Sequence, residues 1–276
     1  MIFNMRILSL GAGVQSSTLA LMIERGELPM VDGAIFADTL GEPKEVYDWL
    51  EWLETKLSYP IHRVSFGDLK QDTLDSAKGI GQYKFLTIPV FTTNSMTKKK
   101  GLLRRQCTSN YKINPVNQKV RELLGLKKGQ HRKEGTNVEM LMGISYDEMF
   151  RIRNNQIKWI TNVYPLVDLK IQRKDCEEWF SKYYNKVPPR SACTFCPYKT
   201  NTEWLHLKNN SRQEWNNVVQ FDKEIRVGTK TNDKVYLHAE RIPLDEVDLT
   251  NSKVKNQIDL FEGNGLVDEC EGMCGV

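Results

Sequence analysis

The sequence lacks any long uninterrupted hydrophobic run, and this absence sets the first limits on what the chain is. None of its apolar stretches approaches the roughly 18 residues that a membrane-spanning helix needs. The first ten residues also lack the small-residue cleavage site of a secretory signal peptide, so we expect a cytoplasmic protein with no membrane partner. There is no internal repeat and no long tract of one residue type, which argues against a repeat protein or a mainly disordered chain.

Cysteine and histidine are also scarce, with six and four among the 276 residues. Because no secretory signal accompanies them, six cysteines do not indicate a disulfide framework. None of the histidines lies in a motif that would mark it as a general base. What the chain does have is 40% hydrophobic and 27% charged residues, the composition of a globular protein with one large domain or two modest ones.

The net charge of +4 hides a strong asymmetry along the chain. Residues 98–133 contain twelve basic residues and one acid, whereas residues 240–276 contain nine acids and three bases. A concentrated positive charge favours an anionic partner, either the phosphates of a small nucleotide or a nucleic-acid backbone, and a solvated basic loop is the alternative. We expect the acidic tail to close over the basic segment.

Short apolar runs alternate with amphipathic segments in the first third of the chain, which predicts a doubly wound parallel α/β sheet. Strands are expected at residues 7–10, 33–38, 61–66 and 138–144, and helices at 18–25, from Pro43 to about 57, 115–124, 173–184 and twice within 200–225. Residues 75–106 are predicted to be a long loop, and the chain from Val227 onward to be loosely structured. We therefore expect a nucleotide-binding domain of residues 1–190 and a cysteine-containing helical and irregular extension of residues 191–276.

The glycine-rich turn after the first expected strand is a candidate phosphate site. Glycines allow a tight turn there, and the N–H groups at the start of the next helix attract an anion. The turn has neither the Gly-Lys-Ser/Thr ending of a Walker loop nor the G-x-G-x-x-G spacing, and a plain tight turn is the alternative. The candidate phosphate-binding residues are Ser9, Gly11, Ala12, Gly13, Gln15, Ser16 and Ser17.

Five segments in the same order resemble the phosphoadenylyl sulfate (PAPS) reductases and the N-type ATP pyrophosphatases, which share the adenine nucleotide alpha hydrolase-like fold. They are residues 11–17, 37–42, 105–108 with Lys112 and Pro115, 143–148 with Arg151, and 164–168 followed by Cys193 and Cys196. The resemblance covers about residues 5–200. It implies an adenine nucleotide, ATP or an adenylyl sulfate, and adds Asp38, Arg105, Lys112 and Arg151 to the candidate nucleotide ligands.

Two positions depart from the family pattern. Gln15 stands where the pyrophosphatases usually have an Asp that could help to hold Mg²⁺, and Ser145 stands where Arg is typical. The first departure weakens the case for cleavage of ATP, and the second weakens the case for the standard reductase substrate.

The Cys193-Thr194-Phe195-Cys196 motif can chelate one metal or one cluster, because its turn points both sulfurs the same way. The resemblance aligns Cys107 with the cluster-binding cysteines of iron-sulfur reductases. Three thiolates predict a [4Fe-4S] cluster with one open iron. The alternatives are a Zn²⁺ site completed by Cys270 or Cys274, and thiols without a metal. Cys176 lies on the apolar face of an expected helix and is predicted to be a core residue.

The tail around Cys270 and Cys274 resembles the Glu-Cys-Gly element of the reductases, whose cysteine attacks a nucleotide-bound sulfate. The resemblance thus implies a reductase that releases sulfite from adenylyl sulfate with a thiol electron donor. The alternatives are an ATP-dependent, iron-sulfur-dependent sulfurtransferase that thiolates a nucleic acid or a small molecule, and a non-catalytic zinc-stabilised nucleic-acid-binding protein. A homo-oligomer is compatible with each of these.

Overall fold

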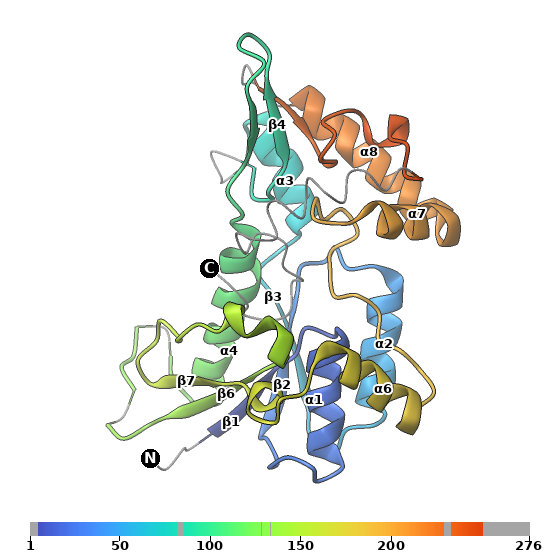
Figure 1. The fold of residues 1–276 in the computed structure, drawn as a ribbon. Helices are drawn as coiled ribbons and strands as arrows, with labels where there is room; N and C mark the ends of the chain where they lie inside the picture. The colour runs from blue at the N-terminus through green and yellow to red at the C-terminus, as the bar shows by residue number, and fades with distance from the viewer. Residues whose placement is uncertain (1–4, 82–85, 128, 133, 229–232, 251–276) are drawn as a thin grey trace.

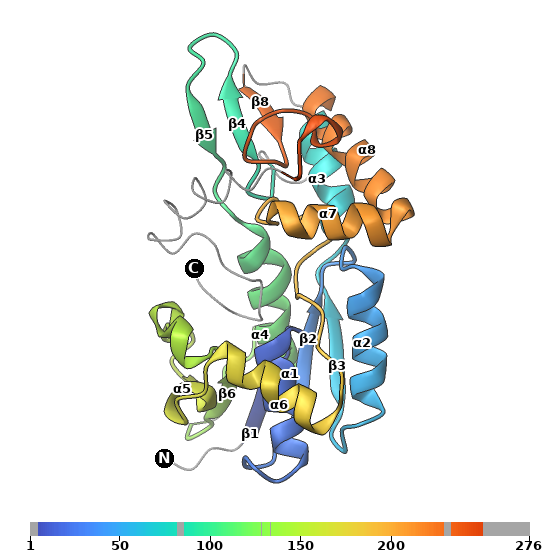
Figure 2. The same ribbon diagram turned by 45° about the vertical axis from the view of Figure 1, so that its right-hand side comes forward.

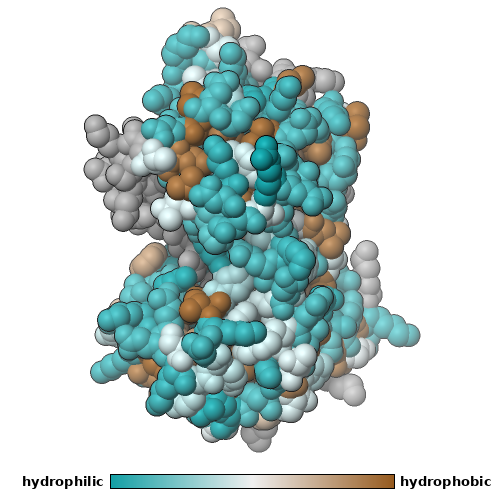
Figure 3. All heavy atoms as spheres, turned by 90° about the vertical axis from the view of Figure 1, so that its right-hand side faces the viewer, coloured by the Kyte–Doolittle hydropathy of each residue, from teal (hydrophilic) through white to brown (hydrophobic). Residues whose placement is uncertain are grey.

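The computed structural model describes residues 5–81, 86–127, 129–132, 134–228 and 233–250. These residues form two lobes that lie one above the other in Figures 1 and 2. The lower lobe contains a five-stranded sheet and the upper lobe a three-stranded sheet. Figure 3 shows a mostly hydrophilic surface on one side of both lobes, with the molecule narrowing between them.

The lower lobe is built on a parallel sheet, which confirms the predicted fold class. Its strands are β1 (Met5–Ser9), β2 (Gly33–Asp38), β3 (Ile61–Ser65), β6 (Val138–Met142) and β7 (Ile160–Val163). Their order is β3-β2-β1-β6-β7, and every neighbouring pair is parallel. The direction of winding reverses between β1 and β6. In such sheets, ligands bind outside the carboxyl ends of the strands at this switch point.

Helices cover both faces of the parallel sheet. Residues such as Leu8 and Phe36 belong to a core cluster shared with α1 (Val14–Glu24), α2 (Lys44–Glu54) and α6 (Arg173–Tyr183). Ile7 and Ile35 belong instead to a cluster shared with α4 (Asn114–Leu123). Adjacent residues of a strand thus enter different clusters, as the alternating geometry of a strand requires. Three short helical segments complete the lobe: Thr108–Ile113, Tyr146–Arg151 and α5 (Pro165–Asp168).

The upper lobe corrects two predictions. Residues 75–106 are not a continuous loop, because they include the end of α3 (Leu69–Lys78), β4 (Phe91–Asn94) and β5 (Lys100–Leu102). The chain after Val227 is not loosely structured throughout, because β8 (Asp233–Tyr236) pairs antiparallel with β4 and a short helical turn, Leu244–Glu246, follows. This sheet, in the order β5-β4-β8, packs with α7 (Asn201–Asn210) and α8 (Arg212–Gly228).

The expected domain boundary at residue 190 stays a prediction. The core of the upper lobe combines Leu74 and Val90 with Trp204 and Phe221, so it draws on segments from both sides of that boundary. No helix among the described residues is both long enough and apolar enough to cross a bilayer.

Candidate nucleotide and cysteine site

The turn between β1 and α1, residues 11–17, is the candidate phosphate loop, and hydrogen bonds within it fix its shape. Ala12 adopts a φ of +61°, in the left-handed region, and the N–H of Gly11 donates to the hydroxyl oxygen of Ser16 at 3.2 Å. That hydroxyl in turn donates to the carbonyl of Gly13 at 3.4 Å. The helix that follows has no acidic residue in its first turn, so the partial positive charge of its N-terminus is not neutralised there.

Two further observations at this turn bear on a ligand. Ser9 is 2% exposed, and its hydroxyl has no hydrogen-bond partner in the described part of the chain. A buried polar atom without a partner is costly, so a bound group could satisfy it. By contrast, Ser17 accepts a hydrogen bond from the indole N–H of Trp49 at 3.0 Å, so its hydroxyl already joins α1 to α2.

The loop after β6 packs directly on the phosphate loop. A Cβ atom added to Gly143 would lie 2.7 Å from the backbone nitrogen of Ser16, closer than van der Waals contact allows. The absence of a side chain at this position is therefore what lets the two loops meet at the switch point.

Gln15 is fully buried and joins the phosphate loop to two other segments. Its Oε1 accepts from Arg173 at 3.3 Å, and its Nε2 donates to Glu148 Oε2 at 3.2 Å and to the Ser145 hydroxyl at 3.5 Å. Arg151 Nη1 lies 2.7 Å from the same Glu148 oxygen. The candidate ligand Arg151 is thus connected to the loop through Glu148 and Gln15.

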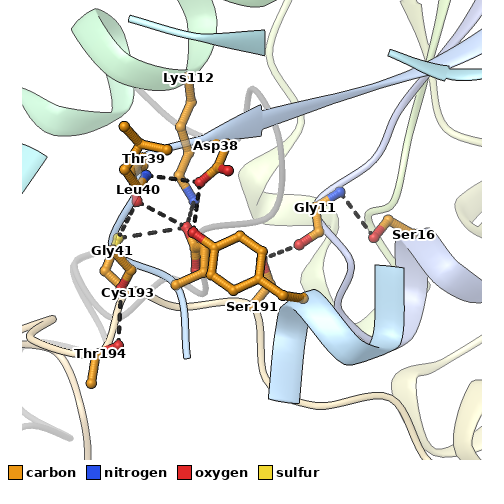
Figure 4. Close-up of polar contacts among 12 residues, drawn as sticks. Gly11, Ser16, Asp38, Thr39, Leu40, Gly41, Lys112, Ser191, Cys193 and Thr194 are labelled. Atoms are coloured by element: carbon orange, nitrogen blue, oxygen red, sulfur yellow. Dashed lines mark hydrogen bonds and ion pairs between the residues drawn. The ribbon is translucent and has the colours of Figure 1, made fainter. Parts of the chain in front are cut away.

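Asp38 orders the loop after β2, as Figure 4 shows. Its Oδ1 accepts from the Leu40 N–H at 2.7 Å and from the Tyr47 hydroxyl at 2.9 Å. Burial of Tyr47 is the main reason that the pKa of its phenol is raised, and the hydrogen bond to Asp38 raises this pKa further. The phenol therefore stays protonated and donates to Asp38. This carboxylate holds the loop in place, while its Oδ2 makes none of these bonds.

Cys193 belongs to a buried polar cluster with Thr39 and Glu42 of the segment after β2. Its sulfur lies 3.1 Å from the Thr39 hydroxyl and 3.6 Å from Glu42 Oε1. The same carboxylate oxygen accepts from Thr39 at 3.1 Å and lies 3.8 Å from the ammonium of Lys112. Because the Lys112 and Glu42 side chains are 6% and 1% exposed, this is a buried ion pair.

The three cysteines predicted to be ligands line one recess between the lobes. The recess holds about 360 Å³ of space, counting its open mouth. The Cys107 N–H donates to the Thr87 carbonyl at 3.0 Å, and the Arg105 guanidinium lies 5.9 Å from the centre of the Tyr198 ring. The lining residues are Thr39, Leu69, Ile88, Pro89, Arg105, Cys107, Lys112, Cys193, Phe195, Cys196, Pro197 and Tyr198.

The donor atoms of the recess suit a thiolate-bound metal or cluster. In the described part of the chain, however, no group of three His, Cys, Asp or Glu side chains is placed to hold a metal ion without rearrangement. Cys193 contacts Thr39 and Glu42 in this arrangement.

Residues 191–196 connect the cysteine recess to the phosphate loop (Figure 4). The Ser191 hydroxyl donates to the carbonyl of Gly11. Three residues on, the N–H of Thr194 donates to the carbonyl of Gly41 at 2.7 Å. A Cβ added to Gly41 would lie 2.5 Å from the Phe195 ring, so these segments are in close contact. The cysteine segment thus bridges the loops after β1 and β2.

The structure brings most of the candidate residues to this edge of the sheet. The phosphate-loop residues and Asp38 lie on adjacent loops, and Arg105, Lys112 and the three cysteines line the recess. Cys176 is fully buried in the core of the lower lobe. Cys270 and Cys274 lie outside the described residues, as does most of the acidic tail.

Sequence reasoning missed several residues that organise this site. Ser191, Arg173 and the Glu42 carboxylate make contacts across the loops, yet none was a candidate ligand. For Ser191, the one local signal in the sequence was its position two residues before the Cys193 motif. For Arg173 and Glu42, the partners are distant in sequence and no spacing rule marks them.

Comparisons with known proteins give little beyond this geometry. No protein-family model and no curated protein matches the chain. Among solved structures, the phosphoadenylyl-sulfate (PAPS) reductase from Candida auris, determined as a phosphate complex, is similar to it. The two are 16% identical with a TM-score of 0.41, over 67% of this chain and 75% of that one. At this level of similarity, the match assigns no activity to the chain.

Proposed function

We propose that this chain binds an adenine nucleotide at residues 11–17 and acts on it by sulfur chemistry, as an adenylyl sulfate reductase of the PAPS reductase type. The observation that carries the proposal is the bridge made by residues 191–196. Ser191 contacts the phosphate loop at Gly11, while Cys193 and Cys196 two and five residues later line the recess. The proposed phosphate-binding turn and the cysteines are thereby held next to each other.

The phosphate end of the nucleotide would meet the N–H groups at the start of α1 and the unpartnered hydroxyl of Ser9. Arg105 and Lys112 also line the recess, and Lys112 is paired there with the buried Glu42 carboxylate. The N-terminus of α1 and the Arg105 guanidinium would stabilise the negative charge that develops on the departing nucleotide phosphate.

In the reductive reaction, a cysteine thiolate attacks the sulfur of the bound adenylyl sulfate. A sulfur–sulfur bond forms, the bond between sulfur and the bridging phosphate oxygen breaks, and the nucleotide leaves with that electron pair. A second thiolate then attacks the cysteine sulfur, sulfite departs with the electron pair of the sulfur–sulfur bond, and a disulfide remains. An external dithiol reduces this disulfide. Cys270 and Cys274 are the proposed nucleophiles.

Sulfite release tests this proposal. Wild-type protein with adenylyl sulfate or PAPS and a dithiol is expected to release sulfite, and Cys270→Ser combined with Cys274→Ser to release none. Cys176→Ala is the matched control, because Cys176 lies in the core of the lower lobe away from the recess. Sulfite release by the double variant at the wild-type rate would exclude the tail as nucleophile, and no release by wild type would exclude the reductase.

The alternative activity is ATP-dependent thiolation of a nucleic-acid or small-molecule acceptor. One observation favours it: three cysteines share one recess beside the phosphate loop. In this reaction, the acceptor oxygen attacks the α-phosphate and pyrophosphate leaves, after which a sulfur nucleophile displaces AMP. Pyrophosphate release from ATP, in the presence of Mg²⁺, only when RNA or DNA is added would distinguish this activity from the reductase.

We further propose that Cys107, Cys193 and Cys196 bind a [4Fe-4S] cluster. The alternative is a Zn²⁺ site, which is also the metal site expected if the chain is a non-catalytic, zinc-stabilised nucleic-acid-binding protein. Their shared recess and thiolate chemistry support this, although their side chains would have to move to gather around a metal. Iron, acid-labile sulfide and zinc in anaerobically purified protein test it. A cluster is expected to be lost in Cys193→Ser and kept in Cys176→Ala. Protein with neither iron nor zinc would exclude both centres.

A further inference from the structure

The three-stranded sheet of the upper lobe presents a face on which side chains of two kinds are arranged in rows. In the β5-β4-β8 register, Phe91 lies opposite Leu102 and Tyr236, and Thr93 lies opposite Lys100 and Lys234. Directly paired residues share a face, and residues two apart on a strand share it too. One face therefore carries an apolar row, Leu102-Phe91-Tyr236, beside a basic row, Lys100-Thr93-Lys234. We call it the basic sheet face.

The positive charge of this face is not neutralised locally. Residues 91–106 include five bases and no acid. Lys99, Lys100, Arg104 and Lys234 are exposed, and none of them forms an ion pair with another described residue. Lys98 donates to the Ser95 carbonyl at 2.8 Å and is also exposed.

The nearest acid on these strands does not face the lysines. Asp233 lies opposite Asn94, in a row that alternation puts on the other side of the sheet, and it accepts from the Asn94 amide at 2.7 Å. The β4–β5 hairpin projects from the end of the upper lobe in Figures 1 and 2, and its residues Lys98, Lys99 and Lys100 are exposed.

The aromatic rings of the apolar row are paired with guanidinium groups. The Arg241 guanidinium lies 5.4 Å from the centre of the Phe91 ring, and its Nε donates to the Thr92 carbonyl at 3.1 Å. The guanidinium of Arg226 lies 5.7 Å from the Tyr236 ring, while it also pairs with Asp222. Phe91 is only 9% exposed and packs with Ala239 and Leu102, so its ring is covered, whereas Tyr236 is half-buried. A partly exposed aromatic ring is a surface on which unpaired bases stack, regardless of sequence.

The rest of the basic segment, residues 98–133, is used differently. Lys112 is buried against Glu42, the Lys119 ammonium lies 3.6 Å from Glu122, and Arg121 donates to the Gln130 carbonyl at 2.6 Å. Lys112, Lys119 and Arg121 are thus engaged with other residues around α4, whereas the lysines of the hairpin are exposed.

We propose that the basic sheet face binds a single-stranded nucleic acid, with the lysines on its phosphates and the partly exposed Tyr236 ring beside its bases. A single strand suits this surface because its bases are free to stack, whereas in a duplex they are not. This inference does not rest on the proposed reaction at the phosphate loop.

Binding of a fluorescein-labelled oligouridylate, measured by anisotropy over a series of salt concentrations, tests the proposal. An oligothymidylate and a DNA duplex of the same length are compared. The test variant is Lys98→Gln/Lys99→Gln/Lys100→Gln. The matched control, Lys56→Gln/Lys174→Gln/Lys182→Gln, removes the same charge from exposed positions of the lower lobe. Equal thermal unfolding of the two variants establishes that both are folded.

Wild type is expected to bind both single strands more tightly than the duplex, and the hairpin variant roughly tenfold more weakly than wild type at low salt. Each lost phosphate contact lowers the slope of log affinity against log salt by about 0.7, so the slope falls by about 2. Absence of binding by wild type, equal loss in both variants, or a preference for the duplex would each overturn the proposal. Gly143→Ala, which disturbs the phosphate loop, is expected to bind the strand normally, and this separates the face from the nucleotide site.

Discussion

The side-chain nitrogen of Gln15 lies 3.5 Å from the hydroxyl oxygen of Ser145, and both side chains are fully buried. These are the two positions at which the sequence departs from the family pattern, where an Asp and an Arg are usual. Both departures therefore fall on one contact.

A carboxylate at position 15 is expected to destabilise the protein. In Gln15→Glu, which keeps the side-chain length, an oxygen replaces the nitrogen that lies 3.2 Å from Glu148 Oε2, so a hydrogen bond becomes a repulsion between like charges. We expect the free energy of unfolding to fall by about 1–3 kcal/mol in urea titrations. Gln15→Glu/Glu148→Gln restores opposite hydrogen-bonding roles and should recover part of the loss. An unchanged stability of the single variant would contradict this account.

A methyl group at Gly143 is expected to displace the phosphate loop. The added Cβ would lie 2.7 Å from the Ser16 nitrogen and 2.8 Å from its Cα, and backbone atoms cannot rotate away as a side chain can. We expect Gly143→Ala to cost about 1–3 kcal/mol of stability and to weaken adenine-nucleotide binding, measured by calorimetry. Gly125→Asn is the control, because a Cβ there meets nothing within 4 Å and Asn tolerates a positive φ. Nucleotide binding unchanged in Gly143→Ala would place the nucleotide elsewhere.

Removing the charge of Lys112 is expected to leave the Glu42 carboxylate buried without its cation. The cost of breaking a buried ion pair on one side is about 3–5 kcal/mol, since the remaining charge has lost both water and partner. Lys112→Met should therefore be strongly destabilised in urea, and Lys112→Met/Glu42→Gln should be closer to wild type. If the double variant is as unstable as the single one, the loss comes from packing rather than from the unpaired carboxylate.

The sequence predicted the elements whose signals are local and missed those that depend on distant partners. The strands β1, β2 and β3 are short apolar runs bounded by turns, and they lie where expected. The hairpin of β4 and β5 is polar, and β4 is completed by β8 about 140 residues away, so no periodicity marked either edge of that sheet. Long-range pairing of this kind depends on tertiary contacts rather than on propensity.

The site divides in the same way. The glycines and serines of residues 11–17 and the Cys193 motif are recognisable as short patterns. That Ser191 contacts Gly11, or that Arg173 reaches Gln15 from a helix 158 positions away, follows only from the folded chain.

Burial of His238 makes the stability of the protein dependent on pH. Its Nδ1 accepts from the Glu240 N–H at 3.2 Å, so Nε2 carries the proton and donates to Asn201 Oδ1 at 2.8 Å. Burial lowers the pKa of His238 from 6.5 to about 4. The folded protein therefore holds this ring neutral at a pH where the unfolded chain already binds a proton.

The sign follows from this difference in proton uptake. Between about pH 6.5 and about pH 4, the unfolded state binds more protons at this ring, so the free energy of unfolding falls as the pH falls. Each unit of pKa difference corresponds to about 1.4 kcal/mol of stability. The contribution of His238 is complete above pH 6.5, and by pH 4 the free energy of unfolding has fallen by about 3 kcal/mol because of this ring.

Urea titrations of wild type and His238→Gln at about pH 7.5 and about pH 5 isolate the contribution of His238, because other titrating groups are common to both proteins. His238→Gln should lose less stability on acidification than wild type. The control is His131→Gln at an exposed position, which should lose as much stability as wild type. Equal losses in all three proteins would mean that His238 titrates alike in the folded and unfolded states.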